Sequence, residues 1–534
     1  MTEAAQEAFS QTNFGMLDWG IVGVYLMISV AIGLYVKRYV SDMATYIGAG
    51  RKVGTWLGVA TMTGTELGLI TVMYMAQKGF SAGFAAFHMA LIAGVATLFV
   101  GLTGFIVVPL RKLEVLTIPE FYEKRFSRGI RVLGGVMLAF AGILNMGLFL
   151  KVGSMFIVGI TGMSSEGEAL KIVMVVLLLL VLIYTTMGGM ISVILTDYIQ
   201  FVVLAFGLLV ATGIAIMSLG WDHIFVTIGE QMGEGGFNPA AEDSAFGWEY
   251  ILWMTVTAGL VGSAVWPTAV ARALAMESTQ ALKRQYMWSS VSFTVRFMLP
   301  MFWGICAYVY VMTSPDGEDL KSLFFPPEGS GIEPVDNLYA LPVFMGRLLP
   351  PVMVGLIAAA MIAAFMSTHD SYFLCWSSVI TQDIIAPLRG GNLSTKARVK
   401  LTRIVIVLIG GYVLYWGMFY KGGEDIWDYM AVSGGIFFTG AFVVLVLGIY
   451  WKGASTFGAL LGLLSGFLML LGLAPVQQAV GLRYVNAAGE TIERLSSAQL
   501  GLIVIAIAFV TMIAGSLIIP DRAAAADVNE RSKN

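Results

Sequence analysis

The stretch Thr61-Met62-Thr63-Gly64-Thr65-Glu66-Leu67-Gly68 lies halfway along an apolar segment, residues 55–76. That segment is long enough to cross a membrane, which takes about 20 mostly apolar residues. Two glycines and three threonines around one acid weaken a regular helix and leave backbone carbonyls free. This composition is typical of a broken helix whose backbone coordinates a cation. The alternative is a packing notch of small residues, with the acid hydrogen-bonded to a neighbouring helix.

The composition of the whole chain agrees with a membrane setting. Of its 534 residues 58% are hydrophobic and 12% charged, and the mean hydropathy is +0.82. A soluble chain carries about 25% charged residues. We therefore expect a polytopic, all-α membrane protein. The 31 Lys and Arg against 34 Asp and Glu leave no basic surplus for binding nucleic acid.

Thirteen segments are long and apolar enough to span a bilayer, and the longest are expected to be tilted or broken. They cover residues 17–36, 55–76, 83–110, 132–160, 171–187, 190–218, 250–270, 287–313, 350–384, 402–420, 425–450, 455–474 and 499–519.

The distribution of Lys and Arg over the connections predicts an N-terminus outside and a C-terminus in the cytoplasm. With that orientation the inner connections and tail hold 22 of the 31 basic residues, and the outer connections hold 7. Lys151 and Arg296 fall within spans, where snorkelling or pairing with an acid is expected. The connection 219–249 has six acids and no Lys or Arg, as expected of an outer loop.

Several functional classes lack support in the sequence. Cys306 and Cys375 lie in apolar stretches, which indicates buried thiols rather than a disulfide framework. No Walker loop, HExxH or GxSxG motif is present, so no enzyme is expected. Residues 1–16 contain no Lys or Arg and do not resemble a cleavable signal peptide.

Three further places carry ionisable residues at membrane depth, where such residues favour a functional role. The first is Ala363-Ala364-Phe365-Met366-Ser367-Thr368-His369-Asp370-Ser371, which offers hydroxyls and a carboxylate suited to an alkali cation, or else hydroxyls bonded to their own helix. The second is Asp197, which is either part of an ion route or an acid stabilised by a helix dipole. The third is His88, more typical of a structural histidine than of a ligand contact.

Five short motifs, in this order along the chain, resemble the sodium:solute symporter family, which includes sodium/glucose, sodium/proline and sodium/sialic acid transporters. The resemblance spans roughly residues 17–475. The motifs are Leu116-Thr117-Ile118-Pro119-Glu120-Phe121 with Arg125-Phe126; Gly188-Gly189 with Thr196-Asp197-Tyr198-Ile199-Gln200; Pro267 with Arg272-Ala273-Leu274-Ala275; Thr381-Gln382-Asp383-Ile384; and Gly448-Ile449-Tyr450-Trp451-Lys452.

The resemblance implies a five-plus-five inverted-repeat (LeuT-like) fold, with one helix before the repeats and two after, in agreement with the thirteen spans. The parts of the chain would then be an outer N-terminal segment (1–16), the extra first helix with an inner loop (17–54), the first repeat (55–218), the acidic outer loop (219–249), the second repeat (250–450), two additional helices (451–519) and a cytoplasmic tail (520–534).

The resemblance also implies where sodium would bind. The principal site would use backbone carbonyls of Gly64, Leu67 and Ala364 with the hydroxyls of Ser367 and Thr368. A second site found in some members would combine Asp197 with Ser367 and Thr368, and Asp370 would project beside it. Glu66 could support sodium binding or make the site sensitive to protons.

The substrate is expected to differ from a hexose. Sugar carriers place a lysine, a glutamine and an aromatic gate where this chain has Glu277, Ala431 and Gly262. The expected pocket combines aromatic walls with an acid and a histidine, which suits an amino or quaternary ammonium group but leaves a carboxylate or polyol open. Its residues are Thr65, Glu66, Ile70, Thr71, His88, Trp266, Trp427 and Tyr429.

The sequence thus predicts a sodium-coupled symporter of the plasma (inner) membrane that imports a small organic solute by alternating access. Sodium is the expected coupling ion, and lipid and the solute are the expected partners. A solute sensor and a sodium-independent facilitator on the same fold are the alternatives.

Overall fold

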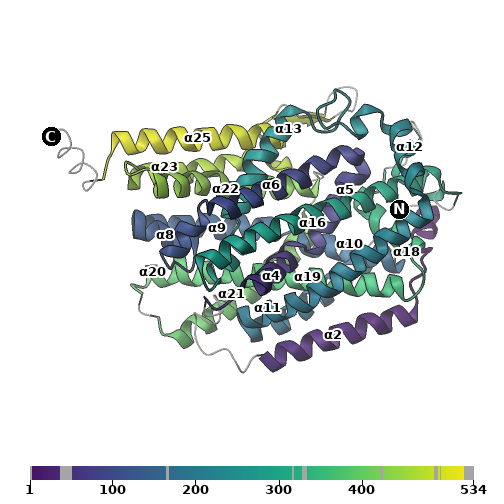
Figure 1. Ribbon diagram of the computed structural model, residues 1–534, viewed down its shortest axis with the longest axis horizontal. Coiled ribbons are helices and arrows are strands. Elements are labelled where there is room, and N and C mark those ends of the chain that lie inside the picture. Colours follow the sequence, from purple (N-terminus) through teal and green to yellow (C-terminus); the bar gives the residue numbers. More distant parts are fainter. Residues whose placement is uncertain are drawn as a thin grey trace.

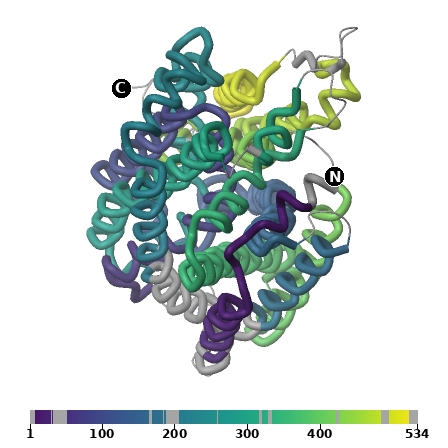
Figure 2. Tube along the Cα trace, turned by 90° about the vertical axis from the view of Figure 1, so that its right-hand side faces the viewer, coloured from purple at the N-terminus to yellow at the C-terminus, as the bar shows by residue number. Residues whose placement is uncertain are grey.

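The computed structural model describes residues 3–36, 51–163, 168–315, 318–327, 334–391, 393–420, 425–485, 491–493 and 495–521. Helices dominate this part of the chain and most of the long ones run along the long axis of the molecule (Figure 1). Turned by 90°, the same helices form a bundle several layers deep, with α25 at one edge (Figure 2).

The α-helices, in chain order, are α1 (Glu3–Ser10), α2 (Met16–Val36), α4 (Thr55–Glu66), α5 (Leu69–Ala82), α6 (Phe87–Thr103), α7 (Val107–Lys112), α8 (Ile118–Arg125), α9 (Arg128–Met146), α10 (Phe149–Thr161), α11 (Glu168–Leu219), α12 (Trp221–Met232), α13 (Trp248–Trp253), α14 (Gly262–Val265), α15 (Pro267–Leu274), α16 (Thr279–Thr313), α17 (Glu318–Phe324), α18 (Ala340–Leu348), α19 (Met353–Val379), α20 (Ala386–Leu388), α21 (Thr395–Phe419), α22 (Ile426–Tyr450), α23 (Thr456–Ser465), α24 (Ala474–Ala479) and α25 (Ser497–Ile518).

Shorter elements connect them. The 3-10 helices are η3 (Gly83–Ala86), η4 (Glu234–Gly236), η7 (Asn337–Tyr339) and η9 (Gly466–Gly472), and the π-helices are η5 (Met254–Val261) and η8 (Ile380–Ile385). Strands β1 (Arg483–Val485) and β2 (Thr491–Glu493) form an antiparallel hairpin in which Tyr484 pairs with Ile492.

Eight helices in the described residues are long and apolar enough to cross a membrane, or nine if the bent pair Ala205–Leu219 and Trp221–Met232 is one span. This confirms a multi-pass membrane protein, while the count of thirteen remains a prediction. Two of the expected spans, 171–187 and 190–218, lie in the single helical element α11. The expected outer loop 219–249 begins with helix α12. Gly220 precedes this helix and Gly233 follows it, both with positive φ.

Helix α19 lies at the centre of the bundle. It packs against α11, α4 and α5, and 89% of the apolar window of Met353–Leu388 is buried, against 39% for α21 and for α25. A helix that is apolar all round and enclosed by others belongs to the core. The Ser- and Thr-bearing stretch of the sequence therefore faces protein on every side.

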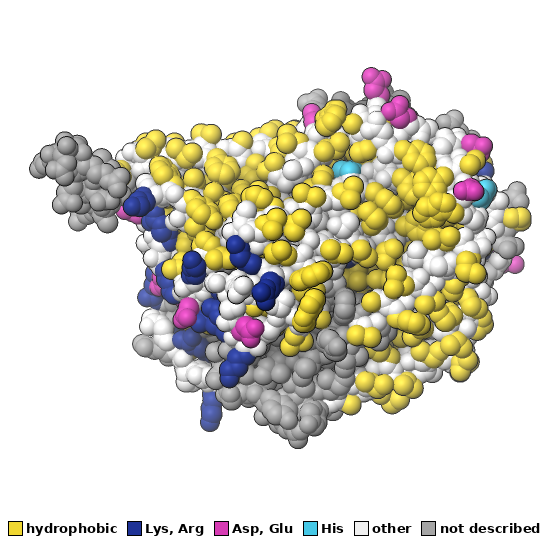
Figure 3. All heavy atoms as spheres, in the orientation of Figure 1, with side chains coloured by type: hydrophobic (Ala, Val, Ile, Leu, Met, Phe, Trp, Pro, Cys, Tyr) yellow, Lys and Arg dark blue, Asp and Glu magenta, His cyan; other side chains and the backbone are white. Residues whose placement is uncertain are grey.

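Charged side chains divide between the two ends of the molecule. Lys and Arg gather at the end that holds α8 and α20, a broad apolar surface follows, and several acids lie near α12 and α13 at the other end (Figure 3). Exposed basic residues of the first end include Lys52, Lys112, Lys124, Arg128, Arg284, Arg389, Lys396, Lys400 and Lys452. This separation of the charges agrees with the orientation predicted from the connections.

Candidate functional site

The expected break in the second apolar segment is present. Helix α4 ends at Glu66, Leu67 leaves the helical region with φ −91° and ψ 63°, and α5 begins at Leu69. A Cβ added at Gly68 would lie 2.0 Å from the Thr368 hydroxyl oxygen, so the close approach of α19 requires glycine there. The carbonyls at the end of α4 are thereby released from helical pairing.

The residues of the expected principal sodium site meet at this break. Ser367 Oγ donates to the carbonyl of Gly64 at 3.2 Å, and Thr368 Oγ1 donates to the carbonyl of Thr65 at 3.3 Å. Leu67 and Ala364 are buried beside them. Carbonyl and hydroxyl oxygens in one dry place suit sodium, and each hydroxyl could turn its lone pairs to an ion. Among the described residues, no group of three or more His, Cys, Asp or Glu could hold a metal ion.

A second break lies in the segment expected at 250–270. Trp266 has ψ 119° and Pro267 begins α15, because a proline disfavours helical geometry in the residue before it. Thr268 Oγ1, in the first turn of α15, donates to Glu66 Oε1 at 2.6 Å. The two breaks are therefore joined directly by a hydrogen bond.

Glu66 has a second partner in Arg296 on α16. Arg296 Nη1 lies 3.2 Å from Glu66 Oε2 and donates to the Glu66 carbonyl at 2.7 Å. Both side chains are about nine-tenths buried. Arg296 thus pairs with an acid, one of the two roles expected for it.

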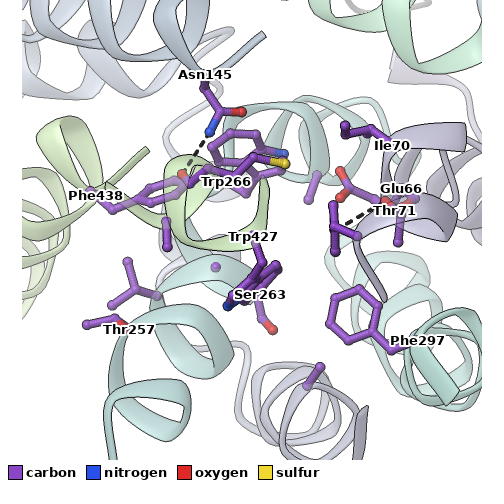
Figure 4. Close-up of a pocket in the computed structure, with 18 of the residues that line it drawn as sticks. Glu66, Ile70, Thr71, Asn145, Thr257, Ser263, Trp266, Phe297, Trp427 and Phe438 are labelled. Atoms are coloured by element: carbon purple, nitrogen blue, oxygen red, sulfur yellow. Dashed lines mark hydrogen bonds between the residues drawn. The ribbon is translucent and has the colours of Figure 1, made fainter. Parts of the chain in front are cut away.

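A cavity of about 140 Å³ lies between the two breaks. Figure 4 shows Glu66, Ile70 and Thr71 on one side of it and Trp266, Phe438 and Asn145 on the other, with Trp427 and Ser263 between them. Six of the eight residues expected in the pocket line it, namely Thr65, Glu66, Ile70, Thr71, Trp266 and Trp427. Gly262 and Ala431, two of the positions that differ from sugar carriers, line it too.

The other two expected pocket residues lie outside the cavity lining. His88 Nδ1 lies 2.7 Å from the Ala85 carbonyl, and its ring packs edge-on against Phe246. Tyr429 donates its hydroxyl to the Leu144 carbonyl. Both side chains are used in helix packing.

A buried polar chain continues from the breaks toward Asp370. Arg272 Nη2 donates to Ser371 Oγ at 2.6 Å, and Ser371 Oγ donates to Asp370 Oδ1 at 3.2 Å. Asp370 and Arg272 are 0% and 1% exposed. The side chain of Asp197 lies outside the described residues, so the structure does not place it relative to Asp370.

Several residues of the site were not anticipated from the sequence. Arg272 lies beyond the expected span 250–270, but Pro267 starts helix α15, which holds the Arg272 side chain in the core. Thr268 and Asn145, which the sequence did not single out, also belong to the site or its supports. Arg296 was singled out as a charge at membrane depth, but its place in the cavity lining was not expected.

Two broken helices that meet over a cavity in a predominantly helical membrane protein are typical of a class of secondary transporters. The chain matches the sodium:solute symporter family over residues 46–466 and belongs to that family. It is a transporter rather than an enzyme, and its family supports sodium-coupled import of a solute.

Relatives of known function are distant. A sodium/proline symporter of Staphylococcus aureus is 21% identical over 86% of each chain. A sodium/pantothenate symporter of Haemophilus influenzae is 26% identical over 53% of this chain and 54% of its own, so the alignment spans about half of that relative.

Solved structures confirm the fold. A sodium-coupled sialic acid symporter in a substrate-bound outward-open state has a TM-score of 0.74 at 19% identity, covering 95% of this chain and 98% of its own. MhsT in complex with L-phenylalanine has a TM-score of 0.51 at 15% identity, covering 86% and 99%.

Proposed function

We propose that the protein is a secondary active symporter that uses the sodium gradient to import a small organic solute across the plasma membrane by alternating access. The observation that carries this proposal is the break between α4 and α5, where released carbonyls face Ser367 and Thr368 of α19 beside the cavity. Because Thr368 belongs both to the expected sodium site and to the cavity lining, an ion bound there would shape the substrate pocket.

The finer features of the proposal follow the family pattern. Sodium would bind Gly64, Leu67, Ala364, Ser367 and Thr368, with a second site at Asp197, Ser367, Thr368 and Asp370. The two broken helices would be the first helices of two inverted repeats, which rock about the cavity. The distribution of Lys and Arg supports an N-terminus outside and a C-terminus inside.

The solute would lie in the cavity, against Trp266 and Trp427. Aromatic walls and the Glu66 carboxylate are compatible with an amino or ammonium group, and Gly262 and Ala431 leave a hexose without its usual partners. The relatives named above transport proline or pantothenate with sodium, and both kinds of solute belong in a first panel of candidates.

Uptake into proteoliposomes, with and without an inward sodium gradient, tests the function. We expect uptake only with the gradient. Ser367→Ala should raise the sodium concentration needed for half-maximal uptake, because it removes a proposed ligand. Ser465→Ala is a matched control, since Ser465 is also a buried serine on an apolar helix, donates to the Leu461 carbonyl and does not line the cavity.

The other outcomes separate the alternatives. Uptake that ignores sodium in the wild-type protein would make it a facilitator. Solute binding without any uptake would make it a sensor.

A further inference from the structure

Arg296 uses only part of its hydrogen-bonding capacity within the protein. It lines the cavity and is 8% exposed. Both of its hydrogen bonds to described residues leave from Nη1 and go to Glu66. The Nε atom is buried and has no hydrogen-bond partner. One edge of the guanidinium, formed by Nε and Nη2, is thus unpaired in the described part of the structure.

The guanidinium of Arg296 packs against two aromatic rings of its own helix. Its central carbon lies 3.7 Å from the ring centre of Phe293 and 4.6 Å from that of Phe297. These rings hold the guanidinium by cation–π contact, and hydrogen-bond acceptors reach it along its edge. A buried donor such as Nε is unfavourable without an acceptor, and a bound ligand can supply one.

A purely structural role for Arg296 explains the contacts of Nη1 alone. Pairing with Glu66 neutralises the charge, but it leaves three of the five N–H donors of the guanidinium unpaired. A planar acceptor with two oxygens, placed along the free edge, would satisfy these donors with two parallel hydrogen bonds. A carboxylate is the common small-molecule group with that geometry.

The rest of the cavity suits an apolar body attached to such a carboxylate. Glu66 and Arg296 are the charged side chains among the residues that line it in the described structure, and they pair with each other. The wall opposite Glu66 is formed by Trp266 and Phe438 (Figure 4). Apolar and aromatic surface around a few convergent polar groups is the usual make-up of a small-molecule site.

We propose that the transported solute carries a carboxylate, that the Nε–Nη2 edge of Arg296 binds it, and that Arg296 is therefore the residue that selects for substrate charge. This inference rests on the proposed symport function. A zwitterion fits as well, since its amino or ammonium group can face the aromatic walls. A cation without a carboxylate does not fit, because it would leave the donors of Arg296 unpaired. The nearby sodium ion would favour the anionic group and so couple the two bindings.

Matched pairs of an acid and its amide test the proposal, because they share one body and differ in charge. Thermal unfolding of the purified full-length protein is measured in sodium and in potassium with L-proline and L-prolinamide, L-phenylalanine and its amide, pantothenate and its primary amide, and phenylacetate and phenylacetamide. We expect one or more of the acids to stabilise the protein in sodium. The matching amide should bind at least about 100-fold more weakly than the acid.

The variant Arg296→Lys keeps the positive charge but loses the two-donor edge. We expect it to bind the acid at least 10-fold more weakly. Arg347→Lys is the matched control, since Arg347 pairs with Asp319 outside the cavity. If Arg296→Lys does not fold, the comparison of acid and amide on the wild-type protein decides alone.

Three outcomes overturn the proposal. Equal binding of an amide and its acid, or undiminished binding of the acid by a folded Arg296→Lys protein, rejects the carboxylate while sodium-driven uptake stands. Stabilisation only by ammonium compounds without a carboxylate rejects it in the same way. Failure of every compound in the panel, together with failure of sodium-driven uptake, rejects the symport function and this inference with it.

Discussion

Two ion-pair clusters lie at opposite ends of the molecule and hold it together in different ways. The Lys78 cluster joins α5 to the start of α22, with Lys78 Nζ 2.6 Å from Asp425 and 3.5 Å from Asp428. The Lys78 side chain is 9% exposed, whereas the two acids are 36% and 28% exposed. The compact ammonium of Lys78 is thus paired with two carboxylates that are partly exposed to solvent.

The Arg131 cluster, at the end that bears the exposed Lys and Arg, is more extensively bonded. Arg131 Nε donates to Asp383 at 2.9 Å, Nη1 to Glu123 at 2.5 Å and Nη2 to the Gln382 carbonyl at 3.0 Å. Thr117 also donates to Asp383, which is fully buried. A planar guanidinium bonded to several fixed acceptors constrains the relative positions of the helices more than an ammonium paired with two carboxylates does.

The difference indicates that the two ends of the molecule are held closed with unequal strength. The Arg131 cluster ties α8, α9 and η8 by directional bonds to the fully buried Asp383, whereas both acids of the Lys78 cluster are partly exposed to water. We therefore expect the Lys78 end, which the basic residues predict to be the outer one, to open with less cost.

The largest effect should follow from removing the buried acid. Asp383→Ala leaves Arg131 without its buried partner and should lower the free energy of unfolding by about 3–5 kcal/mol. Asp425→Ala, at the other end, should lower it by about 0–1 kcal/mol, because that acid is more than a third exposed. Thermal unfolding of the two purified variants measures both. Equal losses would show that the two clusters do not differ in strength.

An intermediate effect is expected on access to the cavity. Lys78→Met should shift the population toward a state open at that end, by the 5- to 30-fold that about 1–2 kcal/mol produces. The rate at which a membrane-impermeant maleimide labels Ser263→Cys in the cavity lining measures this, in a background with Cys306→Ala and Cys375→Ala.

Arg131→Met is the comparison variant for this measurement. It should raise the labelling rate from the opposite side of the membrane and lower it from the Lys78 side. Faster labelling from the same side in both variants would indicate general loosening rather than two separate closures.

The smallest effect is expected at Asp428. Its oxygen lies 3.5 Å from Lys78 and Asp425 remains in place, so Asp428→Asn should cost no more than about 1 kcal/mol. Since the pair is partly solvated, the cost should shrink further in high salt. Melting temperatures at low and high ionic strength give the result. A large, salt-independent loss would mean that the Lys78 cluster is as firm as the Arg131 cluster.

The sequence was informative wherever the signal was local. Glycines and threonines at 61–68 predicted the break, and the Ser367-Thr368 pair predicted a polar face on a buried helix; both are present. Pro267 could have predicted the second break, because the residue before a proline avoids helical geometry.

Partners across the fold could not be obtained in this way. Thr268 and Arg296, which hold the Glu66 side chain, are 202 and 230 residues away along the chain. His88 lies outside the cavity because its helix turns that face toward Phe246, whose ring packs against the imidazole. A single sequence holds no information on pairing at such separations.

The pairing of Glu66 with Arg296 also has an electrical consequence. Because the two charges cancel, the side chains that line the cavity add no net charge movement when the cavity opens to the other side of the membrane. The charge moved per cycle is therefore that of the sodium ions and the solute. A monoanion with one sodium ion moves none, whereas a zwitterion with one sodium ion moves one elementary charge, which gains about 2.3 kcal/mol from a potential of 100 mV. The current that accompanies uptake therefore counts the sodium ions, once the charge of the solute is known.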